Sequence, residues 1–146
     1  MKTKRIREYI AGNWWTQTNL GTNNSMIKNN HLCMASRTNN HIVLRGQTGF
    51  DLKGVLHGKN DIKEQTLTAC RCVEELIKEG GGSLKDICKI TVYLTERSFI
   101  PNALKIIQEK LGGAKPALSI IITGLALKDL LVEIDCDVAL GEDEDG

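Results

Sequence analysis

The sequence lacks several features that would point to particular classes of protein. No window of the 146 residues is apolar over a length that spans a membrane. The basic start continues into Tyr9, Gly12 and Asn13 instead of an apolar run, so we expect no secretory signal. Histidine is scarce, and no pair among the three has the spacing of metal ligands. We therefore expect a protein without a membrane partner, a metal or another cofactor.

An excess of charge of one sign is also lacking. The chain has 19 basic and 18 acidic residues, which gives a formal net charge of +1. No overall field therefore draws the protein to nucleic acid or to an anionic membrane. Basic residues are frequent in 2–7, and acidic residues fill 142–145. We interpret both segments as solvated tails and expect no nucleic-acid partner.

Cysteine is present in an odd number, five, so no scheme of internal disulfides pairs them all. This favours a reduced, cytoplasmic protein. Cys70 and Cys72 lie two residues apart in a helical pattern, where their side chains face different directions. A shared metal or a redox pair is therefore not expected there, and we predict that most of the cysteines are small buried apolar residues.

The hydrophobic pattern predicts one domain at 31–140, preceded by an N-terminal extension at 1–30 and followed by an acidic tail at 141–146. The apolar residues Tyr9, Ile10, Trp14 and Trp15 suggest that the extension packs on the domain. Alternating apolar residues predict strands at 32–36, 42–47, 87–95, 116–123 and 131–140.

Two segments have helical periodicity. The first begins at Asp61, with Glu64 in the position of a capping box, and runs to about Lys78. The glycines at 80–82 follow this helix, so they suit a C-cap and turn and not a phosphate-binding loop. The second helix covers 99–111. The order ββαβαββ predicts an α+β sandwich, in which two helices cover one face of one mixed sheet.

The last predicted strand carries a row of carboxylates. Its apolar residues alternate with Glu133, Asp135 and Asp137, which therefore share the face turned away from the helices. Lys89 and Tyr93 are expected on the same face and compensate part of this charge. Either water or another subunit covers the row.

Four segments carry a resemblance to a known family: Arg45–Asp51, Lys89–Thr95, Pro116–Ser119 and Val132–Asp135. In this order and spacing they resemble the Rid family of reactive-intermediate deaminases, also called YjgF-type or L-PSP proteins. The resemblance covers about residues 32–140. It implies a chorismate-mutase-like fold, a ring-shaped homotrimer, and a pocket for a small-molecule ligand at each subunit junction.

The resemblance also identifies pocket positions, and several of them depart from the members that hydrolyse imines. Leu118 stands where those members have the arginine that grips the substrate carboxylate, so the chain resembles an arginine-lacking branch. Arg45 stands for a serine, Leu32 for a tyrosine and Asp135 for the catalytic glutamate. The matching positions are Gly46, Gln47 and Ser119.

The resemblance implies a deaminase or hydrolase that acts on a small imine, enamine or related nitrogen compound. Asp135 is then the catalytic residue, which orients or deprotonates a water, and Arg45 is the cationic anchor. The alternative for both is structural: Arg45 is an exposed strand residue or pairs with the carboxylates, and Asp135 pairs with Arg45 or Lys89. A non-catalytic binding protein is the second interpretation. An endoribonuclease, which the name L-PSP implies, is the third, and the lack of a histidine pair and of a basic stripe disfavours it.

Overall fold

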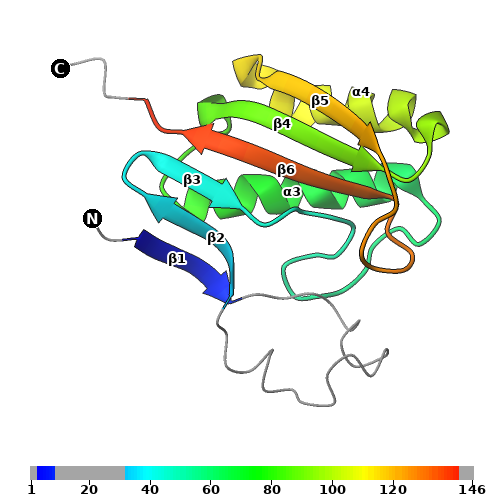
Figure 1. The fold of residues 1–146 in the computed structure, drawn as a ribbon, viewed down its shortest axis with the longest axis horizontal. Helices are drawn as coiled ribbons and strands as arrows, with labels where there is room; N and C mark the ends of the chain where they lie inside the picture. Colours follow the sequence, from blue (N-terminus) through cyan, green and yellow to red (C-terminus); the bar gives the residue numbers. More distant parts are fainter. Residues whose placement is uncertain (1–2, 9–31, 142–146) are drawn as a thin grey trace.

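The computed structural model describes residues 3–8 and 32–141, which form a six-stranded sheet with two helices on one face (Figure 1). The strands are β1 (Thr3–Glu8), β2 (Cys33–Thr38), β3 (His41–Leu44), β4 (Ile87–Leu94), β5 (Ala117–Ile122) and β6 (Val132–Ala139). The helices are α3 (Ile62–Glu79) and α4 (Ile100–Leu111), and the short 3₁₀ helices are η1 (Leu84–Asp86), η2 (Arg97–Phe99) and η3 (Gly112–Ala114).

The sheet is mixed, with the strand order β1-β2-β3-β6-β4-β5. β4 and β5 run parallel because α4 connects them as a crossover, and the other neighbours are antiparallel. The α+β class, the mixed sheet and the two helices on one face are therefore confirmed. No helix among residues 3–8 and 32–141 is long and apolar enough to cross a membrane.

The sheet has one strand more than the expected ββαβαββ order. β1 lies inside the segment that we predicted as an extension, and it pairs antiparallel with β2 from Thr3 opposite Thr38 to Glu8 opposite Cys33. Ile6 is its one large apolar residue and is 3% exposed, so the local sequence carries no alternating pattern. The packing of Tyr9, Trp14 and their neighbours, and the acidic residues after Gly141, lie outside the described residues.

α3 begins and ends where the sequence places its caps. The Asp61 carboxylate accepts the backbone N–H groups of Lys63 and Glu64 at 3.1 and 3.2 Å, which satisfies two donors of the first turn. At the other end the C-cap is Gly80, and Gly81 has a φ of 90°, a conformation that glycine adopts without strain. The glycine run is therefore the end of a helix, as predicted.

The core lies between the two helices and the inner face of the sheet, which is the face that the helices cover. Every second residue of β6 is buried there, as the alternation predicts. The helices meet this face with the predicted apolar stripes, whose buried members are Cys70, Val73, Leu76, Ile77, Ile107 and Leu111.

All five cysteines are free thiols, and three of them are part of this core. Burial raises the pKa of Cys70 and of Cys136 to about 12 and that of Cys72 to about 11, so these thiols stay protonated. The prediction that most cysteines are buried apolar residues is confirmed. Cys88, at the start of β4, is exposed.

Candidate functional site

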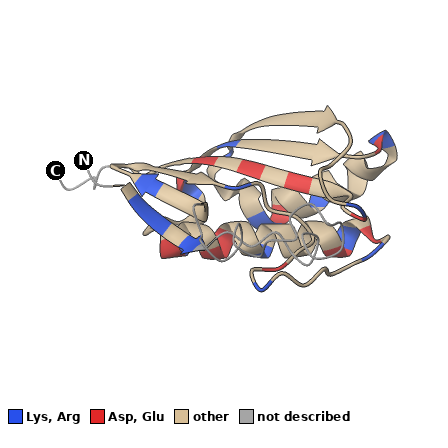
Figure 2. Ribbon diagram, turned by 60° about the horizontal axis from the view of Figure 1, so that its bottom comes forward, with Lys and Arg blue, Asp and Glu red and all other residues tan. Residues whose placement is uncertain are grey.

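The outer face of the sheet, which is the face without helices, carries the acidic row predicted for β6 (Figure 2). The pairing of β4 with β6 sets Tyr93 opposite Glu133, Thr91 opposite Asp135 and Lys89 opposite Asp137. Residues that are paired in this way point to the same face. The predicted sharing of one face by these side chains is therefore confirmed.

The pairing between β3 and β6 is irregular next to the acidic row. Val43 pairs with Asp137, whereas Gln47 pairs with Ile134. Three residues, 44–46, therefore stand opposite two, 135 and 136, which is the count of a β-bulge. Bulges re-aim side chains, and this one brings Arg45 and Gly46 beside the carboxylates of β6.

Gly46 lies so close to the side chains of β6 that a side chain at this position would displace them. A Cβ atom on Gly46 would be 2.7 Å from Asp135 Oδ1 and 2.7 Å from Glu133 Cγ. Gln47 fixes the bulge, because its buried side-chain amide donates to the Arg45 carbonyl at 2.6 Å. Its backbone exchanges two hydrogen bonds with Ile134, at 2.8 and 2.9 Å. The Gly-Gln pair thus holds the two strands in contact at the acidic row.

The two carboxylates beside Gly46 are partly removed from water. Burial raises the pKa of Glu133, the charge of Asp135 raises it further, and Arg45 lowers it. Burial also raises the pKa of Asp135, with a further increase from Asp137, while a hydrogen bond with Tyr93 and the charge of Arg45 lower it. The Asp135 charge in turn raises the pKa of the Tyr93 hydroxyl. Arg45 therefore faces two carboxylates that compete for its charge.

We define the outer-face cluster as Arg45, Gly46, Tyr93, Glu133 and Asp135. The sequence assigns three of these residues to a site, namely Arg45, Gly46 and Asp135. It does not assign Tyr93 and Glu133. The available signal for Glu133 and Tyr93 was the strand alternation, which places both on the face of Asp135. The family pattern does not indicate them, because it includes only one carboxylate on β6.

Two other predicted residues lie on β5, the edge strand. Ser119 is level with Thr91 and therefore with Asp135, two strands or about 10 Å away. Its hydroxyl accepts a hydrogen bond from Lys89 Nζ at 2.8 Å. Leu118 is level with the core residue Ile90, so it belongs to the opposite face and is 42% exposed at the edge. Within one chain, Leu118 and Asp135 do not meet.

The remaining predicted residue, Leu32, directly precedes β2 and is 58% exposed. Gln47 is buried to within 1% exposure, so it supports the cluster and does not offer its side chain to a ligand. No group of three or more His, Cys, Asp or Glu side chains within the described residues has an arrangement that holds a metal ion.

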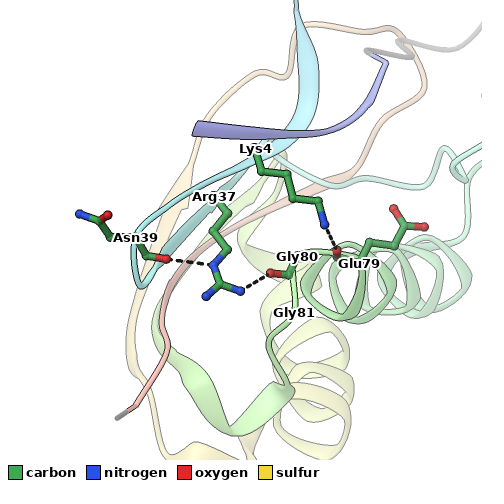
Figure 3. Close-up of a pocket in the computed structure, with 6 residues that line it drawn as sticks. All are labelled: Lys4, Arg37, Asn39, Glu79, Gly80 and Gly81. Carbon is green, nitrogen blue, oxygen red and sulfur yellow. Dashed lines mark hydrogen bonds between the residues drawn. The ribbon is translucent and has the colours of Figure 1, made fainter. Parts of the chain in front are cut away.

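A second place to consider is a pocket of about 370 Å³ at the C-terminal end of α3 (Figure 3). The Arg37 guanidinium lies between the turn and the helix end, and donates to the carbonyls of Asn39 and Gly80, both at 2.9 Å. Lys4 Nζ reaches the Glu79 carbonyl at 3.4 Å. These cations meet the carbonyls that a helix leaves without partners, so the pocket is a structural clamp.

A third place is the pair of Asp51 and His57, whose Oδ2 and Nε2 atoms are 2.7 Å apart. The other carboxylate oxygen of Asp51 accepts the backbone N–H groups of Lys53 and Val55 at 2.9 and 3.0 Å. Partial burial alone would raise the pKa of Asp51, but these hydrogen bonds and His57 lower it. The pair therefore closes a loop and is explained by structure alone.

Comparison with known proteins identifies the family of this chain. The family model described as Endoribonuclease L-PSP matches residues 22–140. A RutC family protein of Pyrococcus abyssi is 32% identical over 101 residues, which cover 69% of this chain and 80% of that protein. The chain therefore belongs to the Rid family, also called YjgF or L-PSP, as the sequence motifs indicated.

Solved structures confirm the fold. A Mycobacterium tuberculosis member of the YjgF/YER057c/UK114 family superposes with a TM-score of 0.71 at 20% identity, over 95% of this chain and all of that one. RidA from the bacterium Psychrobacter superposes with a TM-score of 0.68 at 24% identity, over 75% of this chain and 89% of that one. The residues of the outer-face cluster come from three segments of the family resemblance, 45–51, 89–95 and 132–135, so we take the cluster as the candidate site.

Proposed function

We propose that this Rid-family member is a deaminase-type hydrolase of a small imine, enamine or related nitrogen compound. Asp135 is the general base that orients and deprotonates a water, and Arg45 holds a polar group of the substrate. The observation that supports this most directly is the bulge at 44–46, which brings Arg45 against Asp135 from a different strand. Leu118 leaves the chain without the family's carboxylate-binding arginine.

The electrostatics of the cluster suit such a base. A carboxylate with a raised pKa is a stronger base than one in water, and burial raises the pKa of Asp135. Tyr93, opposite Glu133 on the neighbouring strand, interacts with the same carboxylate and lowers its pKa. Hydrolysis of a C=N bond needs little more than an oriented water and a group that takes its proton.

We further propose that the pocket is completed at a subunit junction of a homotrimeric ring. The outer face carries apolar side chains beside the half-buried carboxylates: Val43 is 53% exposed and Ile121 is 43% exposed. Leu118, which lies on the opposite face from Asp135 in one chain, and Leu32, which is exposed before β2, are then available to line the pocket of a neighbouring subunit. Light scattering is expected to give three times the 16.1 kDa chain mass. A monomer at micromolar concentration would remove the pocket.

The test is ammonia release from two freshly generated substrates, 2-iminobutyrate and an imine without a carboxylate. We expect turnover of the second and poor turnover of the first, because Leu118 offers no fork for a carboxylate. Arg45→Ala and Asp135→Asn are each expected to reduce turnover by about 100-fold or more, with the oligomer intact and the melting temperature little changed. Asp137→Asn, on the same face of the same strand, is the matched control and retains activity.

The outcomes separate the functions. Robust turnover of 2-iminobutyrate that Arg45→Ala leaves unchanged contradicts the proposed role of Arg45. Ligand binding without ammonia release favours a non-catalytic binding protein. Cleavage of RNA that Asp135→Asn abolishes would favour the activity named in the family description. In the described residues, His41 lies at the start of β3 and His57 is engaged by Asp51, so the structure offers no support for that activity.

A further inference from the structure

The outer-face cluster has more negative than positive charge. Glu133 and Asp135 both lie against Gly46, and Arg45 is the cation whose charge acts on both carboxylates. Two carboxylates and one guanidinium sum to one negative charge.

Lys89, another cation on this face, is engaged by a different partner. Lys89 is level with Asp137, two residues along β6 from Asp135. Its ammonium donates to Ser119 Oγ at 2.8 Å, toward the β5 edge and away from β3. Tyr93 stands opposite Glu133 and forms a hydrogen bond with Asp135, but its hydroxyl contributes no charge to offset the carboxylates.

The two carboxylates lie beside each other next to the bulge. They are two residues apart on one face of β6, and both side chains reach the place where a Cβ atom on Gly46 would stand, to within 2.7 Å. Gln47 fixes the bulge through the Arg45 carbonyl. Two neighbouring half-buried carboxylates are costly when both are ionised, and a cation between them lowers that cost.

We propose, building on the function proposed above, that the site selects a planar cationic nitrogen group, an iminium or amidinium, on a substrate that carries no carboxylate. Glu133 and Asp135 accept hydrogen bonds from its N–H groups. Arg45, already balanced by these carboxylates, donates to an uncharged carbonyl or hydroxyl of the substrate. An anionic substrate would instead add a third negative charge to the cluster.

The reaction balances with these groups. The water oxygen bonds to the iminium carbon, the C=N π electrons move onto nitrogen, and Asp135 takes a proton from the water. Asp135 then returns the proton to nitrogen, the C–N bond breaks, and the hydroxyl proton leaves with the amine. The products are a carbonyl compound and ammonium, so the substrate and the products carry the same total charge. Glu133 remains ionised throughout as the counter-charge.

The experiment measures binding of three probes of similar shape to the full chain by calorimetry: acetamidinium, acetamide and acetate. Acetamidinium is expected to bind at least about tenfold more tightly than either of the others, because only it makes charge-assisted hydrogen bonds to both carboxylates. Glu133→Gln, which keeps the shape of the side chain, is expected to reduce acetamidinium binding by about tenfold or more. Asp137→Asn is the matched control and should leave it unchanged.

Equal or tighter binding of acetate overturns the proposal. So does an equal loss in Asp137→Asn, because the whole acidic row would then act as a diffuse field. The melting curve of each variant verifies that it is folded. The two proposals fail separately: acetamidinium binding that depends on Glu133, without ammonia release from any imine, removes the hydrolase and leaves the cation site. Turnover of 2-iminobutyrate without acetamidinium binding removes the cation site and leaves the hydrolase.

Discussion

Arg37 and Arg45 belong to one β-hairpin, but Arg37 contacts uncharged carbonyl groups whereas Arg45 acts on charged carboxylates. Arg37 lies at the helix end of α3 and donates to two backbone carbonyls at 2.9 Å. Arg45 lies on the outer face and acts on two carboxylates whose pKa values are raised by burial. Arg37 therefore satisfies carbonyl groups that would otherwise lack a hydrogen-bond partner. Around Arg45 a negative charge remains, and the stability of the fold does not require that charge.

We expect the greatest loss of stability and activity from substitution of Gly46. In Gly46→Val the added Cβ would lie 2.7 Å from Asp135 Oδ1 and from Glu133 Cγ, so the two carboxylate side chains or the bulge must shift. We expect a loss of unfolding free energy of about 3 kcal/mol, at the upper end of the cost of over-packing, together with loss of activity. Gly113→Ala is the control, since nothing lies within 4 Å of the added Cβ. Chemical denaturation measures both, and a fully stable Gly46→Val protein would disprove the close approach.

Arg37→Ala tests the structural member of the pair. It removes two charge-assisted hydrogen bonds to Asn39 and Gly80, so we expect a loss of about 1–3 kcal/mol. Catalysis and acetamidinium binding should not change, in contrast to Arg45→Ala, which should cost activity and little stability. If Arg37→Ala abolished activity with stability retained, the pocket at the α3 end would replace the outer-face cluster as the candidate site.

Glu133→Gln tests, through the pH dependence of stability, whether the outer-face carboxylates cost folding free energy. Because the pKa of Glu133 is raised in the folded state, its ionised carboxylate costs stability above that pKa, and the cost disappears as the pH falls through it. The variant is therefore expected to melt at a higher temperature than the parent at pH 8 and at the same temperature at pH 4. A lower melting temperature at pH 8 would mean that Glu133 is a structural partner of Arg45.

The smallest effect is expected at Arg7, which joins β1 to α3 through Glu75 and Glu79 on the protein surface. Arg7→Ala should cost about 0.2–1 kcal/mol at neutral pH. The hydrogen bond from Arg7 lowers the pKa of Glu79, so this stability is present above the usual glutamate pKa and lost as the pH falls through the lowered one. The difference between variant and parent should thus vanish in acid. If Arg7→Ala still lowered the free energy of unfolding in acid, the loss would come from packing of the Arg7 side chain.

The sequence predicted the elements of the domain well because their signals are local. The Asp61 cap, the glycines after α3 and the alternation in β6 each act over a few residues, and each was confirmed. β1 was missed because Ile6 is its single buried apolar residue and the strand exists through its pairing with β2. A strand stabilised by a distant partner leaves little local pattern.

The candidate site was only partly accessible from the sequence. Arg45, Gly46 and Asp135 were named from the family pattern, and the structure places them together. The pattern did not indicate that Leu118 and Ser119, which are adjacent in the chain, belong to opposite faces of the sheet, nor that Ser119 engages Lys89. Neither did it reveal the bulge, which depends on how β3 and β6 are aligned.

The family, the order of the main elements and the two faces of β6 could be read from the chain, because they follow from motifs and from the two-residue period of a strand. The register between β3 and β6, and with it the nearness of Gly46 to Glu133 and Asp135, exists only in the folded protein. Register is a relation between strands far apart in the chain, and it set two carboxylates, not one, against Arg45.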